Sequence, residues 1–156
     1  MSASSLAAFL PGQTPPAALA IARGTARLLH GLGYSVLGEL TLPSGRRADL
    51  VGLGADGEVW IVEIKSSIED YRADHKWMEY RAHCDRLFFA ASPDTPSDIF
   101  PSDAGLILAD AFDAAIVREA PRYPLHASRR KTMMLAFARS AALRLSAMTD
   151  PQADCR

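Results

Sequence analysis

The sequence predicts one α/β (α+β) domain: a mixed central sheet flanked by helices, with accessory strands and a C-terminal helix. Two patterns favour this fold class: helical apolar spacing near both ends of the chain, and six short strand-like runs between them. The chain has 156 residues, which fits a single domain, and 49% of them are apolar. We expect one folded domain over residues 14–149, a flexible lead-in at 1–13 and a frayed tail at 150–156.

The first half of the chain predicts a helix and then three strands. Thr14 and Pro15 are typical of a helix start, and apolar residues at helical spacing continue as far as Gly31 or Gly33. The three strands are expected at 34–42, 46–53 and 58–65. Two loops separate them, Pro43-Ser44-Gly45 and Ala55-Asp56-Gly57. Each loop suits a three-residue hairpin with its glycine in the left-handed region, so we expect two consecutive antiparallel hairpins.

The second half predicts a helix, three more strands and a last helix. Ser66 and Ser67 are suitable N-caps for a single helix over 68–84. The later strands are expected at 86–91, 105–109 and 115–118. An amphipathic helix is expected over 128–148, with Met134, Phe137, Ala141 and Leu145 facing inward. The order of the core is therefore αβββαβ, followed by the accessory elements.

Acidic residues are expected to meet across the first three strands. If both loops hold three residues, the register places Asp49 opposite Glu63 and Glu39 opposite Asp49. Directly opposed Cβ atoms lie about 5 Å apart, so like charges placed there repel each other. Either Lys65, on the same strand face as Glu63, or a divalent cation can compensate this charge. Mg²⁺ takes carboxylate and water oxygens, and the backbone carbonyl of Ile64 is a further oxygen ligand within reach.

This arrangement is typical of metal-assisted chemistry at a phosphoryl group. A divalent metal activates water and stabilises charge on a phosphoryl oxygen, and a lysine beside it orients the water or neutralises developing charge. Two other interpretations stay open. The acids are solvated or paired with Arg46 and Arg47, or Lys65 itself acts as a nucleophile.

These residues resemble a known family. Asp49 and the run Glu63-Ile64-Lys65 resemble the PD-(D/E)XK nuclease superfamily over about 15–92, its restriction-endonuclease-like αβββαβ core. The segments 46–49, 63–67 and 74–80 are more closely similar to MmcB-type bacterial DNA-repair proteins. The resemblance implies Mg²⁺-dependent DNA cleavage, with Mn²⁺ as a substitute, Asp49 and Glu63 as metal ligands and Lys65 as the catalytic lysine. The chain departs from the superfamily motif at Ala48, which stands where the name-giving proline is expected.

DNA binding has to come from local patches, because the formal net charge is −1. The basic run at 129–131 opens a helix, where cations oppose the helix dipole, and this favours an anionic partner. The candidate DNA-binding residues are Arg23, Arg27, Lys76, Arg129, Arg130 and Lys131.

The sequence thus predicts a metal-dependent DNA nuclease in repair, with a catalytically silent DNA-binding or scaffold module of the same fold as the alternative. DNA and repair proteins are the expected partners, and the oligomeric state stays open, a dimer included. Cys84 and Cys155 have neither disulfide nor zinc spacing, which predicts a cytoplasmic setting. No apolar run approaches the roughly 18 residues of a membrane span, so no membrane partner is expected.

Overall fold

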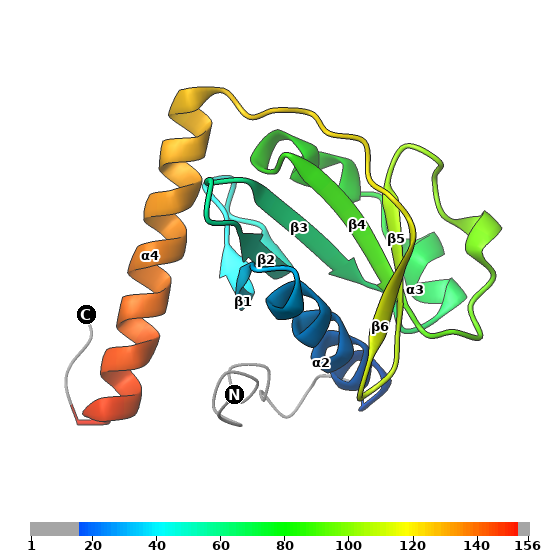
Figure 1. The fold of residues 1–156 in the computed structure, drawn as a ribbon, viewed down its shortest axis with the longest axis horizontal. Helices are drawn as coiled ribbons and strands as arrows, with labels where there is room; N and C mark the ends of the chain where they lie inside the picture. The colour runs from blue at the N-terminus through cyan, green and yellow to red at the C-terminus, as the bar shows by residue number, and fades with distance from the viewer. Residues whose placement is uncertain (1–15, 153–156) are drawn as a thin grey trace.

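The computed structural model describes residues 16–152 and shows one six-stranded mixed sheet with helices on both faces (Figure 1). The strands lie side by side in their order along the chain; β3, β4 and β5 run parallel and the other pairs are antiparallel. The elements are α2 (Pro16–Gly31), β1 (Ser35–Thr41), β2 (Arg47–Leu53), β3 (Val59–Ile64), α3 (Ile68–Ala73), η1 (Trp77–His83), β4 (Arg86–Ala91), η2 (Ser97–Ile99), β5 (Gly105–Ala109), β6 (Ala114–Arg118) and α4 (Ala127–Thr149). The predicted fold class is confirmed.

Some sequence predictions concern residues outside this range. The lead-in at 1–13, the helix start at Thr14 and Pro15, and residues 153–156 lie outside the described residues. Residues 150–152 form a turn after α4. Among residues 16–152, no helix has both the length and the apolar character needed to cross a bilayer.

Both hairpins have the predicted register. Ser35 pairs with Leu53 across β1 and β2, and Leu53 pairs with Val59 across β2 and β3. Gly45 and Gly57 have φ angles of +87° and +88°, the left-handed conformation that closes a three-residue loop at low cost. The loop lengths therefore set which side chains of β2 and β3 share a face.

The β1–β2 ladder is interrupted at Glu39. Gly38 pairs with Leu50 and Leu40 pairs with Ala48, so the register continues on both sides of the interruption. Glu39 itself has a φ of +52°, which is uncommon for a residue with a side chain. The backbone at this point leaves the regular strand, and the expected pairing of Glu39 with Asp49 does not form.

The sheet has a hydrophobic core on each face. Helix α2 covers one face, where Leu29, Leu50, Trp60 and Phe88 are buried together. The other face is covered by η1 and α4, whose Tyr80, Met133 and Phe137 pack with the strand residues of that face, Val51, Ile61 and Leu87 among them. Alternation along β3 places Val59 and Ile61 on the η1 face and Trp60 and Val62 on the α2 face. By the same alternation, Glu63 lies on the η1 face with Val59 and Ile61.

The predicted single helix over 68–84 is wrong. The structure has a six-residue α3 and a separate η1, with Asp74 between them in an extended conformation (φ −86°, ψ 110°). The Asp74 carboxylate accepts hydrogen bonds from Lys65 Nζ and from the backbone N–H of Lys76. These two bonds hold Asp74 outside a helix, because a side chain that caps the backbone two residues ahead favours a turn.

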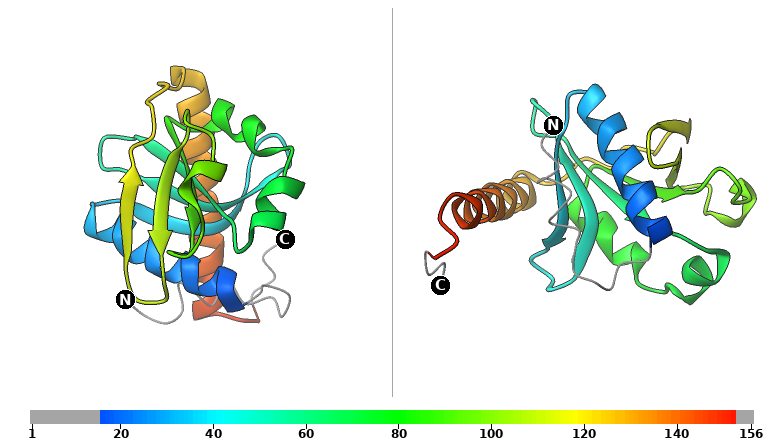
Figure 2. Two further views of the ribbon diagram at one scale, coloured as in Figure 1. Left: turned by 90° about the vertical axis from the view of Figure 1, so that its right-hand side faces the viewer. Right: turned by 90° about the horizontal axis from the view of Figure 1, so that it is seen from below.

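Helix α4 stands at the β1 edge of the sheet, and the views in Figure 2 show that much of its surface faces away from the sheet. Met133 and Phe137 are its buried residues. The predicted inward positions Met134 and Leu145 are wrong, because their side chains are 41% and 60% exposed. Arg130 forms an ion pair with the buried Asp85, and this contact sets the rotation of the helix about its axis. Met133 and Phe137, three and seven positions after Arg130, then face the sheet.

Candidate active site

A pocket of about 560 Å³ opens at the carboxyl end of β3. Asp49 from β2 and Glu63 from β3 lie in its wall, together with Lys65 just after β3. Ala18 and Ala22 of α2 are small side chains on its lining. The structure therefore brings together the three residues that the sequence predicted as catalytic.

The side chains of Asp49 and Glu63 link the ends of β2 and β3 by hydrogen bonds. The backbone N–H of Asp49 donates to Glu63 Oε1 at 3.2 Å, and the backbone N–H of Ile64 donates to Asp49 Oδ2 at 2.8 Å. The backbone pairing between these strands ends at Leu50 and Val62, and beyond it the hydrogen bonds between the strands come from the two carboxyl side chains. The two acids thus lie on one face, as the register predicted.

Burial makes full ionisation of this pair unfavourable. Glu63 is 4% exposed, and burial raises its pKa well above the ordinary value, with the charge of Asp49 adding to the effect. Burial likewise raises the pKa of Asp49, against the lowering effect of the Ile64 N–H and of Lys65. Two adjacent carboxyls, one buried and one half-buried, are stabilised by a proton or a cation between them, so this pair has the electrostatic character of a cation site.

Lys65 has a partner that the sequence did not identify. Its ammonium donates to Asp74 Oδ2 at 2.7 Å, and both side chains are largely buried. Burial lowers the pKa of Lys65, but the hydrogen bond and the charge of Asp74 outweigh it, so the pKa is raised overall. Burial also raises the pKa of Asp74, and Lys65 and the Lys76 N–H outweigh that effect and lower it. Lys65 is therefore a cation fixed in position at the pocket.

The sequence signal for Asp74 was its place in the segment 74–80, which resembles the MmcB-type proteins. Its role was missed because the sequence placed it inside a helix. Within the described residues, the Lys65 ammonium bonds to Asp74 rather than to Asp49 or Glu63.

The predicted row of three carboxylates is reduced to a pair. Glu39 lines the same pocket, but its left-handed backbone takes it out of the ladder opposite Asp49. Its carbonyl oxygen accepts a hydrogen bond from Arg144 of α4. Among residues 16–152, no group of three or more His, Cys, Asp or Glu side chains is arranged to hold a metal ion. Asp49 and Glu63 remain, with the Ile64 carbonyl as the nearest backbone candidate.

Two cations line the pocket without an acidic partner in the described part of the chain. They are Arg47 at the start of β2 and Lys76 before η1. Arg47 was quoted only as part of the family resemblance and as a partner for acids. The structure places it on the lining of the pocket that also holds the carboxylate pair. An anionic substrate in the pocket would therefore meet positive charge from two different elements.

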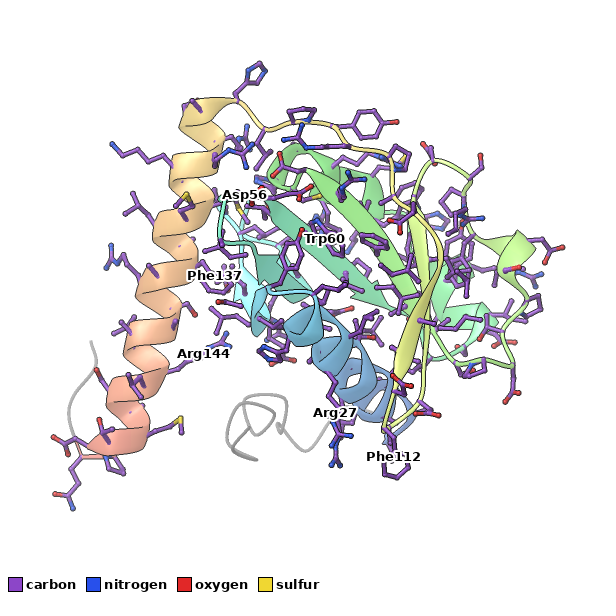
Figure 3. All side chains as sticks on the ribbon, viewed as in Figure 1. Arg27, Asp56, Trp60, Phe112, Phe137 and Arg144 are labelled. Atoms are coloured by element: carbon purple, nitrogen blue, oxygen red, sulfur yellow. The ribbon has the colours of Figure 1, made fainter. Side chains whose placement is uncertain are left out.

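The other predicted DNA-binding residues lie on α2 and α4. Arg23 and Arg27 are exposed on α2, and Arg27 donates to the carbonyl of Phe112, which lies beside it in Figure 3. Arg130 makes a two-pronged ion pair with Asp85 and also donates to the Gly57 carbonyl. Because its guanidinium is occupied internally, the predicted DNA contact of Arg130 has no free donor face in this structure.

The basic run at 129–131 is also distant from the pocket. Gly57 precedes Glu63 by six residues along an extended chain, which is a separation of about 20 Å. Arg129 hydrogen-bonds with His83, and Lys131 is exposed. Contacts of Arg129 and Lys131 with DNA remain predictions for a surface away from the carboxylates.

Comparisons with known proteins bear on the family. A family model described as DNA repair protein MmcB-like matches residues 7–152. A solved structure, the SPO1766 protein of unknown function from Silicibacter pomeroyi, is similar with a TM-score of 0.85 and 43% sequence identity, over 90% of this chain and 95% of that chain. No curated protein matches the chain. Neither match names the PD-(D/E)XK superfamily, so that resemblance stays a prediction.

Proposed function

The chain belongs to the MmcB-like family of DNA repair proteins, and from this premise we propose that it is a Mg²⁺-dependent nuclease that hydrolyses DNA phosphodiesters. The observation that carries the proposal is the pairing of the half-buried Asp49 with the buried Glu63 in a pocket that also contains Lys65. Two ionised carboxylates side by side repel each other, and a bound divalent cation would remove that cost.

The residues present fit a hard divalent cation. Each carboxylate has one oxygen that accepts a backbone N–H, Glu63 Oε1 and Asp49 Oδ2, and the second oxygen of each is the candidate ligand. Two carboxylates with a backbone carbonyl, here that of Ile64, are oxygen donors of the kind that Mg²⁺ or Mn²⁺ prefers. Such a cation supplies activation of water and stabilisation of charge on the phosphate.

The chain's own cations have separate tasks in this proposal. Lys65, held by Asp74, presents a fixed positive charge where negative charge increases on the scissile phosphate. Arg47 and Lys76 bind the neighbouring phosphates, which position the backbone without reading its sequence. A substrate with phosphates on both sides of the cleavage point uses both of these contacts.

The second candidate is a catalytically silent DNA-binding module. One observation favours it: the Lys65 ammonium is already paired with Asp74, and the carboxylates accept hydrogen bonds from backbone N–H groups. A cluster satisfied in this way can persist for structural reasons alone. This module would bind DNA through its cations and leave the strand intact.

A cleavage assay separates the two candidates. The purified chain is incubated with Mg²⁺ or Mn²⁺ and with duplex, nicked, flap and single-stranded DNA. Under the nuclease proposal, Asp49→Asn and Glu63→Gln each reduce cleavage by about 100-fold or more, because loss of one charge-stabilising group costs that much in related chemistry. Glu69→Gln is the matched control, since Glu69 is an exposed acid on α3 close in sequence to the site.

A binding measurement completes the test. Salt-sensitive DNA binding by the wild type, with no cleavage of any substrate, rejects the nuclease and favours the silent module. Metal-dependent cleavage that survives Glu63→Gln rejects the assigned site.

A further inference from the structure

Helix α4 carries a second apolar stripe that the fold does not use. Its members are Met134, Ala138, Ala141, Leu145 and Met148, separated by alternating steps of four and three residues. We call this set the heptad stripe. Met134, Leu145 and Met148 are 41%, 60% and 55% exposed. The residues that attach α4 to the sheet, Met133 and Phe137, belong to a different stripe.

This spacing is that of a helix packed along another helix. Alternating steps of three and four keep one seam of an α-helix facing a partner over several turns. The two alanines lie between larger residues, so a partner backbone can approach closely at the middle. Near its N-terminal end the seam widens into an apolar hollow of about 480 Å³, lined by Met134, Leu135 and Ala138 with the stems of Arg130 and Lys131.

The described part of the chain leaves this seam uncovered. Helix α4 contacts the domain chiefly through β1 and η1. Figure 3 shows Phe137 and Arg144 on the side of α4 that faces the sheet. Five of the ten exposed large apolar side chains of the described residues lie on α4, namely Met134, Leu135, Leu143, Leu145 and Met148. An apolar concentration of this kind marks an interaction surface.

The charge of α4 indicates which kind of partner covers the heptad stripe. Helix α4 contains five basic residues and no acidic one, although the whole chain has a formal charge of −1. Arg130 is paired with Asp85 and Arg144 donates to the Glu39 carbonyl, so the positive charge open to a partner comes from Arg129, Lys131 and Arg139. A second copy of α4 would place basic residues against basic residues, which opposes self-association. A phosphate backbone would match the charge but would leave Met134 and Leu145 without an apolar partner.

We propose that the heptad stripe of α4 is the docking site for an acidic amphipathic helix of a partner protein. The partner helix places its own Leu- or Met-type residues against Met134, Leu145 and Met148. Its Asp and Glu residues lie beside the exposed Lys131 and Arg139. This surface does not depend on the nuclease proposal, because no residue of the heptad stripe lines the pocket that holds the carboxylate pair.

The test uses the full chain and a labelled synthetic helix as probe. The probe has about three heptads with Leu at the seam positions and Glu on either side. A second peptide has Lys in place of every Glu. Fluorescence anisotropy measures both affinities at low and high salt. We expect the Glu peptide to bind at least about 10-fold more tightly than the Lys peptide, and to weaken as salt rises.

Two matched variants locate the contact. Leu145→Ser removes a seam residue and is expected to weaken the Glu peptide about 10-fold. Leu143→Ser makes the same change at a 48%-exposed position two residues earlier, which points to a different side of the helix, and is expected to leave the affinity within about 2-fold. Both positions are exposed, so neither change should unfold the chain.

Four results overturn the proposal. The first is no binding of the Glu peptide at about 1 mM, the weak end of the affinity scale. The second is equal loss of binding in both leucine variants. The third is a wild-type dimer in light scattering that Leu145→Ser dissociates, which assigns the seam to a second copy. The fourth is binding of duplex DNA or anionic vesicles that Leu145→Ser abolishes while the Glu peptide does not compete.

Discussion

The substitution Asp85→Asn is expected to destabilise the fold through one buried carboxylate. Asp85 is fully buried immediately before β4, and its side chain accepts hydrogen bonds from the backbone N–H groups of Val59 and Leu125 and from both terminal nitrogens of Arg130. It therefore joins β3, the segment before α4, and α4 itself. The substitution removes the charge while keeping the shape of the side chain.

Two routes give a similar magnitude. Burial raises the pKa of Asp85, but the hydrogen bond from Arg130 and those from Val59 and Leu125 outweigh it and lower the pKa from 3.8 to about 2. A depression of roughly two pKa units corresponds to about 2.5 kcal/mol of stability at neutral pH. Loss of one member of a buried ion pair typically costs about 3–5 kcal/mol. We expect Asp85→Asn to reduce the free energy of unfolding by about 3 kcal/mol.

The effect has a defined pH dependence. Because the pKa of Asp85 is lower in the folded chain than in the unfolded chain, its contribution is fully present above about pH 4. The contribution is lost as the pH falls through about 2, where the folded carboxylate takes up a proton. The stability difference between wild type and Asp85→Asn should therefore shrink over that interval.

Urea denaturation followed by circular dichroism at pH 7 and at about pH 2.5 measures both quantities. Thermal denaturation at pH 7 should show a melting temperature lower by about 9 °C for a chain of this size. Asp103→Asn is the matched control, because Asp103 pairs with Arg81 at 3.1 Å with its side chain 59% exposed, and such a surface pair contributes about 0–1 kcal/mol. A loss below about 1 kcal/mol for Asp85→Asn at pH 7, or an undiminished loss at low pH, refutes the reasoning.

Two further substitutions test the packing of α2 and α4. A Cβ at Gly24 would overlap the carbonyl oxygens of Asp110 and Asp113, so Gly24→Ala should lower the free energy of unfolding by about 3 kcal/mol in urea denaturation. The control is Gly31→Ala, which has open space around it and should cause no measurable loss. Phe137→Ala truncates an α4 side chain that is 8% exposed, so it should lower the free energy of unfolding by about 3 kcal/mol and speed hydrogen exchange throughout α4. Leu135→Ala, at a side chain that is 53% exposed, should change the free energy of unfolding by less than about 0.5 kcal/mol. An equal effect of the two members of either pair would contradict this account.

The carboxylate pair was predictable from local features. Loop lengths of three residues, each ending in a left-handed glycine, determine the register of both hairpins. Register and alternation then determine that Asp49 and Glu63 share a face. The six strand-like runs were predictable for the same reason, since a period of two is visible within a few residues.

The partner of Lys65 was not predictable in the same way. The segment after Lys65 has helical spacing, and a prediction from that spacing continues one helix to Cys84. In the structure the buried ammonium of Lys65 requires a countercharge, and Asp74 provides it by leaving the helix. Glu39 differs for a comparable reason, because a positive φ at one residue removes it from a ladder that is otherwise regular.

By itself, the sequence determined which residues form strands and which of their side chains share a face, because short-range periodicity and turn chemistry carry that information. Only the tertiary structure decided which charges pair and which side of α4 faces the sheet. The rotation of α4 depends on Arg130 meeting Asp85, 45 residues earlier in the chain. The apolar residues of α4 would allow more than one side of the helix to pack on the sheet. The buried ion pair between Arg130 and Asp85 determines which side does so.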